Sequence, residues 1–205
     1  EDAFEIAIAR AKLAWTQLTE AGFSPNLLDI GGGFPGEAAK NSVFEGMANG
    51  IRTALTTHFG DNQPEVISEP GRFFSCGTQH LAVRIMGKRT RQNTNMYIVN
   101  DGVYGSLNCI LYDGQEVTAE VLLKRAKVVA EEEPTTPSTI WGPTCDSLDG
   151  LVTKEPVLLP QLAVGDWLLF RETGAYTSAA GSTFNGFGRP TRSYFMSESA
   201  VPSID

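Results

Sequence analysis

Two short apolar runs, each halted by a loop of glycine or proline, set the strongest limit on how the first 75 residues can fold. The run at 27–30 is Leu-Leu-Asp-Ile and stops at three glycines, and the run at 66–68 stops at Glu-Pro-Gly-Arg. Each follows a stretch with apolar residues at helical spacing, within 2–21 and 44–59, and Gly22 is placed to end the first of these. Because helix, strand, helix, strand is the order of parallel α/β structure, we predict two helices and two parallel strands.

After about residue 75 the pattern changes to short β-type runs separated by Gly, Pro, Asn and Asp, which is typical of an antiparallel β domain. We therefore predict an α/β domain over 1–76 and an antiparallel β domain over 77–205. The acidic, proline-bearing stretch 131–138 is predicted to be a surface loop. The predicted strands of the second domain are 96–99, 110–112, 139–141, 167–170 and 194–196.

The composition argues against several classes of protein. Of the 205 residues 41% are apolar, which is ample for a folded core. The net charge of -8 argues against a nucleic-acid partner, which normally needs a cationic surplus. No apolar run approaches the roughly 20 residues that span a bilayer, and the first residues lack the cationic start of a signal peptide. We expect a cytoplasmic protein with no membrane partner.

Cysteine and histidine give no sign of a disulfide framework or a metal. Three cysteines are too few and too odd in number for a disulfide framework, so we expect free thiols in a reducing compartment. Neither His58 nor His80 has a partner at metal-ligand spacing, so we predict no metal site. Cys76 and Cys109 lie next to apolar runs and are expected to be structural.

The two loops that follow the predicted strands are candidates for holding a phosphate. Without Cβ atoms, Gly32 and Gly33 let backbone N–H groups approach an anion closely, although the glycine run alone is more typical of a tight turn. Arg72, after Gly71, can add a forked contact to the same phosphate. Glu69 cannot bind that phosphate and would suit a protonated ring nitrogen; the alternative is a surface ion pair with Arg72.

The densest cluster of reactive residues is Trp141–Asp149, which combines one thiol with two carboxylates. Cys145 is a candidate proton donor, because neighbouring negative charge keeps a thiol protonated; the alternative is a buried structural cysteine. Asp113 and Asp146 would suit the cationic tail of a substrate, although acids at turns are usually turn formers. Tyr176 supplies a hydroxyl after the strand at 167–170, with core packing as its alternative.

Together these segments resemble the pyridoxal-phosphate-dependent ornithine decarboxylases, a group of alanine-racemase-like basic amino acid decarboxylases. The resemblance covers essentially the whole chain, and its motifs occur in the family's order. The motifs are Leu-Leu-Asp-Ile-Gly-Gly-Gly-Phe-Pro-Gly at 27–36, Glu-Pro-Gly-Arg at 69–72, Asn-Asp-Gly-Val-Tyr-Gly-Ser at 100–106, Trp-Gly-Pro-Thr-Cys-Asp at 141–146, Gly-Ala-Tyr at 174–176 and Ser-Thr-Phe-Asn-Gly-Phe at 182–187.

The resemblance implies a fold and a set of cofactor ligands. The expected fold is the last βα units of a TIM-type (β/α)8 barrel that binds pyridoxal 5'-phosphate, followed by an antiparallel β-sandwich or β-barrel-like domain. The glycine loop, the Gly-Arg turn and a tyrosine hydroxyl would hold the cofactor phosphate, and a glutamate would pair with the pyridine nitrogen. The implied cofactor ligands are Gly32, Gly33, Glu69, Gly71, Arg72 and Tyr176.

The resemblance also implies an activity and partners: decarboxylation of L-ornithine to putrescine in polyamine biosynthesis, by a homodimer with shared active sites. Cys145 would reprotonate the former α-carbon, and Cys145 and Asp146 would reach into the neighbouring subunit's site. Asp149 and Phe184 are assigned to the same interface, and antizyme is a candidate protein partner. The implied substrate ligands are Tyr112, Asp113 and Asp146.

The family's Schiff-base lysine and ring-stacking histidine have no counterpart in the sequence, so the chain resembles the carboxyl-terminal half of the enzyme and is expected to be inactive alone. Two alternatives stay open: a non-catalytic homologue of the antizyme-inhibitor kind, and a lysine, arginine or diaminopimelate decarboxylase of the same family. The lysines present are Lys12, Lys40, Lys88, Lys124, Lys127 and Lys154.

Overall fold

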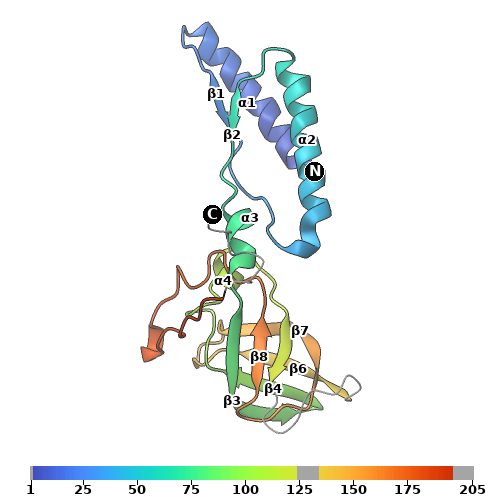
Figure 1. Ribbon diagram of the computed structural model, residues 1–205, viewed down its shortest axis with the longest axis vertical. Coiled ribbons are helices and arrows are strands. Elements are labelled where there is room, and N and C mark those ends of the chain that lie inside the picture. The colour runs from blue at the N-terminus through green and yellow to red at the C-terminus, as the bar shows by residue number, and fades with distance from the viewer. Residues whose placement is uncertain (1, 124–133, 196–205) are drawn as a thin grey trace, which may run out of the picture. The chain divides into compact units, whose positions relative to one another are not determined.

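The computed structural model describes residues 2–123 and 134–195, and the chain divides into two compact units (Figure 1). The N-terminal unit consists of residues 1–82 and 169–176, and the C-terminal unit of residues 83–168 and 177–205. The predicted division at residues 76 and 77 stays a prediction.

The N-terminal unit begins with the predicted amphipathic helix, α1, which spans Asp2–Glu20. Gly22 ends it in the left-handed conformation, with φ at +88°. The amide of Gly22 donates to the carbonyl of Thr19 and that of Phe23 to the carbonyl of Leu18, both at 3.0 Å. These bonds satisfy carbonyls that the helix end would otherwise leave free, so the glycine stop is confirmed.

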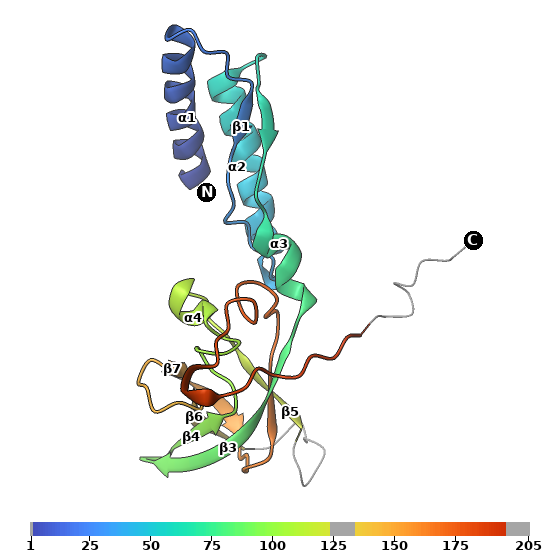
Figure 2. The ribbon, with the colours of Figure 1, turned by 90° about the vertical axis from the view of Figure 1, so that its left-hand side faces the viewer.

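Two parallel strands and a second helix complete this unit's core. Strands β1, Leu27–Asp29, and β2, Glu65–Ile67, pair in parallel, with Leu28 opposite Val66. Helix α2, Asn41–Phe59, runs alongside them with α1 (Figure 2). The shorter elements are η1 Ala38–Lys40, α3 Gly71–Ser75 and η2 Cys76–Thr78. The buried core residues are Ile8, Phe34, Ile51, Ala54, Leu55 and Phe59.

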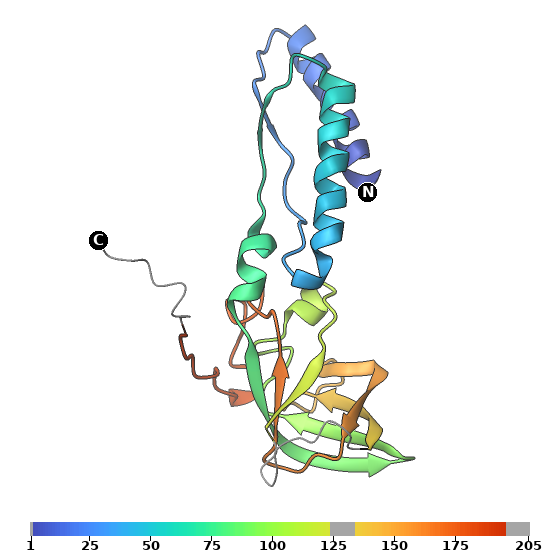
Figure 3. The same ribbon diagram turned by 45° about the vertical axis from the view of Figure 1, so that its right-hand side comes forward.

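The C-terminal unit is built on a curled six-stranded sheet with the order β5-β8-β3-β4-β6-β7 (Figure 3). Pairs β3–β4 and β6–β7 are antiparallel, whereas β4 and β6 are parallel neighbours. Gln92 and Asn93 turn the β3–β4 hairpin with φ of 49° and 61°. The elements are β3 Leu81–Arg91, β4 Thr94–Val99, α4 Cys109–Tyr112, β5 Ala119–Leu123, β6 Thr135–Trp141, β7 Gly150–Pro160, β8 Trp167–Phe170 and η3 Phe184–Gly186.

The sheet's core comes from alternating residues of its strands. Val83, Ile85 and Val99 are fully buried, as are Ile140 of β6 and Leu168 of β8. This period-2 burial is what a half-buried strand requires. It confirms the β character predicted for 96–99, 139–141 and 167–170.

Three local predictions need correction or fall outside the described residues. The run 110–112 is helical in α4, because the amides of Leu111 and Tyr112 both donate to the carbonyl of Asn108, at 3.0 Å. Residues 135–138 of the predicted loop belong to β6, where register with β7 overrides composition, and 131–133 lie outside the described residues. At 194–196, the first two residues form no regular strand and the third is not described.

Within the described ranges, no helix is long and apolar enough to cross a membrane.

Candidate cofactor and substrate sites

The ends of β1 and β2 bring the two predicted phosphate loops together in the N-terminal unit. The amide of Ile30 donates to the carbonyl of Ile67 at 3.0 Å, and the amide of Glu69 donates to the carbonyl of Gly31 at 2.7 Å. A Cβ on Gly32 would lie only 2.8 Å from the carbonyl oxygen of Glu69. Glycine is therefore required for the two loops to approach this closely.

The glycine loop presents amides that fit an anion. Across residues 2–123 and 134–195, the amides of Gly32 and Gly33 make no hydrogen bond, and Gly33 has φ of +88°. Successive backbone N–H groups in such a loop form an anion-binding concavity. The residues present thus fit the phosphate group of a cofactor.

Tyr176 joins these loops from the end of the chain segment that follows β8. The guanidinium carbon of Arg72 lies 5.2 Å from the centroid of the Tyr176 ring. The Tyr176 hydroxyl would be 3.4 Å from a Cβ on Gly71, so it reaches the turn after β2. Tyr176 is 59% exposed and has φ of +53°, a region that non-glycine residues occupy only when the surroundings hold them there.

Backbone contacts of the same unit hold the Tyr176 segment in place. The amide of Gly174 donates to the carbonyl of Cys76 at 2.9 Å, and the Cys76 thiol donates to the carbonyl of Glu172 at 3.2 Å. Burial raises the pKa of Cys76, and the charges of Glu37 and Glu172 add to that shift. Cys76 is thus a protonated, structural thiol, as the sequence indicates.

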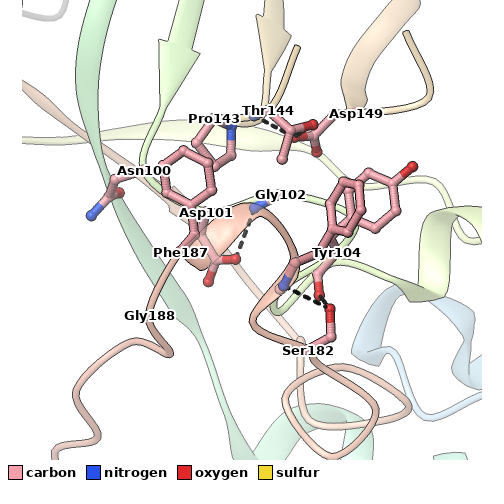
Figure 4. Close-up of a pocket in the computed structure, with 12 residues that line it drawn as sticks. Asn100, Asp101, Gly102, Tyr104, Pro143, Thr144, Asp149, Ser182, Phe187 and Gly188 are labelled. Atoms are coloured by element: carbon pink, nitrogen blue, oxygen red, sulfur yellow. Dashed lines mark hydrogen bonds between the residues drawn. The ribbon is translucent and has the colours of Figure 1, made fainter. Parts of the chain in front are cut away.

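The acidic segment lies in the C-terminal unit, where Asp149 ties two loops together (Figure 4). Its carboxylate accepts the amide of Val103 at 2.9 Å, the amide of Thr144 at 2.9 Å and the hydroxyl of Thr144 at 2.7 Å. A Cβ on Gly102 or Gly142 would overlap this carboxylate. Asp149 is 1% exposed, so within this unit its role is structural: it holds the two loops together.

Asp146 is held by two donors beside Asp149. The Tyr104 hydroxyl donates to its Oδ2 at 2.6 Å, and the amide of Leu148 donates to its Oδ1 at 2.9 Å. The bonds from Leu148 and then Tyr104 lower the pKa of Asp146. The bond to Asp146 is the largest cause that raises the pKa of Tyr104 to about 12. Cys145, next to Asp146, is an exposed free thiol rather than a buried structural one.

The remaining predicted substrate ligands lie at the end of α4. Tyr112 is 84% exposed, and Asp113 follows it as the exposed C-terminal cap of that helix. The charge of Tyr112 contributes to the raised pKa of Tyr104, which lies in the same unit. The two units thus divide the predicted residues between them: the cofactor ligands fall in the first, and Cys145 and the substrate ligands in the second.

The pocket drawn in Figure 4 is not large enough for an amino acid. It lies between the loops after β4 and β6 and the segment 182–188, and its volume is about 10 Å³. That is the space of one water molecule. Tyr104, Asp149 and Ser182 line it, so it belongs to the network that supports the acidic loop.

Two contributions were missed from the sequence. Tyr104 falls within the motif at 100–106 and Asp149 within the acidic segment, but nothing in either motif says which distant group each one contacts. Residues 2–123 and 134–195 contain no cluster of three or more His, Cys, Asp or Glu placed to hold a metal.

Known protein families match both parts of the chain. The pyridoxal binding domain of pyridoxal-dependent decarboxylases matches residues 1–76, and the C-terminal sheet domain of the same family matches residues 66–174. The chain is 46% identical to the ornithine decarboxylase of Mus musculus over 96% of its length, and 48% identical to that of Schizosaccharomyces pombe over 90%. It spans 44% and 42% of those two proteins.

Solved structures of decarboxylases share the fold. The arginine decarboxylase of Paramecium bursaria Chlorella virus, bound to agmatine, is 33% identical with a TM-score of 0.79, over 92% of this chain and 49% of that one. A lysine/ornithine decarboxylase from Vibrio vulnificus, complexed with cadaverine, is 31% identical with a TM-score of 0.74, over 91% and 49%. The fold class and the family resemblance inferred from the motifs are both confirmed, and the chain belongs to the pyridoxal-dependent decarboxylases.

Proposed function

We propose that the protein carrying this sequence is a pyridoxal-phosphate-dependent ornithine decarboxylase, which converts L-ornithine to putrescine and CO₂ in polyamine biosynthesis. The observation that carries the proposal is the direct joining of the glycine loop to the Glu-Pro-Gly-Arg turn, with the Tyr176 hydroxyl beside them. Identity of 42–48% to proteins named ornithine decarboxylase supports the choice of substrate.

The N-terminal unit would bind the cofactor. The amides of Gly32 and Gly33 and the side chains of Arg72 and Tyr176 would hold the phosphate, with Gly71 in the turn that the tyrosine hydroxyl reaches. Glu69 would hold a proton on the pyridine nitrogen. When bound, the pyridine ring supplies an electron sink for the carbanion that remains after CO₂ leaves.

The C-terminal unit would bind the substrate tail and complete the proton transfer. Cys145 would deliver a proton to the α-carbon, a task that suits an exposed thiol beside a carboxylate. Asp146, Asp113 and Tyr112 would orient the distal ammonium. A cationic tail is favoured over the second carboxylate of diaminopimelate, because like charges repel.

The proposal also includes the assembly, the protein partner and the compartment. We infer a homodimer in which Cys145 and Asp146 complete the partner subunit's site, with Asp149 and Phe184 near the interface. The exposed Cys145 and the 56% exposed side chain of Leu148 support this arrangement. Mixing an Arg72→Ala variant with a Cys145→Ala variant should then restore part of the activity, since one site of the mixed dimer is intact. Antizyme binding and a cytoplasmic location remain predictions.

The test is incubation of the full-length gene product with pyridoxal phosphate and L-ornithine. Release of CO₂ and putrescine is expected, and no product above background would contradict the proposal. Lysine and arginine in parallel reactions rank the substrates by kcat/KM, because one methylene changes binding by only about 1–3 kcal/mol. Absorbance of bound cofactor separates an enzyme from a non-catalytic homologue, which should bind none.

A further inference from the structure

We propose that Tyr104 is a positioning residue that fixes the carboxylate of Asp146 and thereby sets the length of diamino acid that the site accepts. The inference rests on the proposed function, in which Asp146 binds the distal ammonium of the substrate. It adds a residue to which neither the sequence motifs nor the family match assigns a role.

The first observation is the geometry of the contact. The Tyr104 hydroxyl lies 2.6 Å from Oδ2 of Asp146, within the roughly 2.5–2.7 Å of hydrogen bonds from a hydroxyl to an ionised carboxylate. The amide of Leu148 holds the other oxygen, Oδ1, at 2.9 Å. Because each oxygen has its own donor, the carboxylate cannot rotate without losing a bond. Each oxygen still has a free lone pair with which to accept an ammonium.

The second observation is that Tyr104 is itself fixed. Its ring lies 4.3 Å from that of Phe184, centroid to centroid, and its carbonyl accepts the amide and the hydroxyl of Ser182 at 2.8 and 2.9 Å. The neighbouring amide of Val103 donates to Asp149. Asp149 also accepts from Thr144, in the loop that carries Asp146, and Figure 4 shows this second contact. The Tyr104 hydroxyl and the Asp146 carboxylate thus lie on two loops, and the buried carboxylate of Asp149 bonds to both loops.

The third observation is electrostatic. The groups that act on the Tyr104 hydroxyl are Asp146, Asp149 and Tyr112, and the bond to Asp146 is the largest reason why the pKa of Tyr104 is raised to about 12. A raised pKa keeps the phenol protonated, so the donor persists until the pH approaches that value. The pKa of Asp146 is lowered, so its charge persists down to pH values below 3.8. The contact between the protonated phenol and the charged carboxylate therefore persists through the neutral pH range, where an amine substrate is cationic.

These observations give Tyr104 a role in specificity. A carboxylate held at a fixed position binds an ammonium best at one distance from the reacting α-carbon. A mobile carboxylate can move to bind the ammonium of substrates whose chains differ in length. One methylene in a binding site is worth roughly 10–200-fold at most. Loss of the hydrogen bond that holds Asp146 should therefore weaken ornithine binding and reduce the preference for ornithine over lysine.

The experiment is the Tyr104→Phe variant of the full-length gene product, which keeps the ring against Phe184 and removes only the hydroxyl. We expect KM for ornithine to rise about tenfold, in line with loss of a hydrogen bond to a charged group, with kcat within about twofold. The ratio of kcat/KM for ornithine to that for lysine should fall. A Tyr104→Phe variant with unchanged KM and an unchanged ratio would overturn the inference, as would an equal loss for both substrates carried entirely by kcat.

Tyr97→Phe is the matched control. It also removes one phenol hydroxyl from the C-terminal unit, but that hydroxyl accepts the amide of Leu162, at 3.2 Å. Stability should fall while KM and the substrate ratio stay unchanged. If Tyr97→Phe moved the ratio as much as Tyr104→Phe, the effect would be one of general stability and the inference would fail.

A second measurement is independent of activity. In carbon-13 NMR titrations, the pKa of the Asp146 carboxyl should rise toward 3.8 in Tyr104→Phe, because one of the bonds that lowers it is gone. An unchanged Asp146 pKa would overturn the contact itself. If the unmodified protein released no CO₂ from ornithine, the proposed function would be wrong. The titration would then still test whether the Tyr104 hydroxyl bonds to Asp146. If Tyr104→Phe did not fold, Phe184→Leu takes its place, because it removes the exposed ring that packs against Tyr104 and leaves Asp146 intact. The ornithine preference should then fall, and a preserved preference would contradict the inference.

Discussion

The two units build their candidate sites from different parts of the chain. In the N-terminal unit the backbone forms the site: amides of a glycine loop, a strand-end hydrogen bond from Glu69 to Gly31 at 2.7 Å, and a glycine whose missing Cβ lets two loops meet. In the C-terminal unit side chains form it: Asp149 fastens the loops, and Tyr104 holds Asp146.

Because of this difference, the two sites should be sensitive to different kinds of amino-acid substitution. A site made of amides is sensitive to added volume, because a Cβ displaces the backbone that binds the anion. A site made of carboxylates and their donors is sensitive to the loss of single polar atoms, because each partner left behind is then unsatisfied. Substitutions in the N-terminal unit should therefore alter cofactor binding, whereas substitutions in the C-terminal unit should alter kinetics or stability.

The largest expected effect concerns both units at once: the 205-residue chain by itself should release no CO₂ from ornithine. Within residues 2–123 and 134–195, three lysines contact other side chains, and Lys154 is an exposed residue of β7. Lys40 contacts Glu37 at 2.8 Å, Lys88 contacts Gln161 at 2.7 Å, and Lys12 lies 4.8 Å from the Phe59 ring. Activity assays of the chain and of the full-length gene product make the comparison. Turnover by the chain, or a pyridoxyl-lysine found in it after borohydride reduction, would contradict the prediction that the chain is inactive by itself.

Cys145→Ala should lower kcat for putrescine formation by roughly 10²–10⁴-fold, because a positioned proton donor contributes about that much. Cofactor affinity, which we assign to the other unit, should not change. Steady-state kinetics and cofactor titration measure the two quantities separately. Ser147→Ala, at an exposed position on the same loop, is the control. A Cys145→Ala variant that retained its kcat would remove Cys145 from the reaction.

Asp149→Asn should lower the free energy of unfolding by about 2 kcal/mol, since an amide nitrogen would face a backbone or hydroxyl donor whichever way it turned. Urea denaturation measures the change. Asp61→Asn, at an exposed position, is the matched control and should have no effect. Equal stability of the two variants would show that Asp149 does not fasten the loops.

The smallest expected effect is that of Gly32→Ala, which should raise the Kd for pyridoxal phosphate about tenfold, or roughly 1.4 kcal/mol. The new Cβ would lie 2.8 Å from the Glu69 carbonyl oxygen and push the two loops apart. Gly77→Ala adds a Cβ with nothing within 4 Å and serves as the control. Fluorescence titration with the cofactor follows both variants. Identical affinities would mean that the close approach of the loops does not shape the phosphate site.

Much of the fold and of the first site follows from local pattern. Helical spacing and the Gly22 stop predicted α1, and apolar runs ended by glycine or proline predicted β1 and β2. Local pattern failed at 110–112, where two β-forming residues, Ile110 and Tyr112, lie in a helical turn with two amides that donate to the Asn108 carbonyl. Strand propensity reflects packing against neighbouring strands, and among the residues that the structure describes 110–112 pairs with no strand.

The sequence by itself determined the family and the motifs, and it predicted the residues that would bind a phosphate, because those signals depend on residue type and short spacing. Only the tertiary structure decided the partners: Tyr104 with Asp146, which are 42 residues apart, and Val103 with Asp149, which are 46 apart. Such bonds form between loops that folding brings together, and glycines at 102 and 142 leave the space for the carboxylate that joins them. No local pattern contains that information, because the space exists only after both loops are in place.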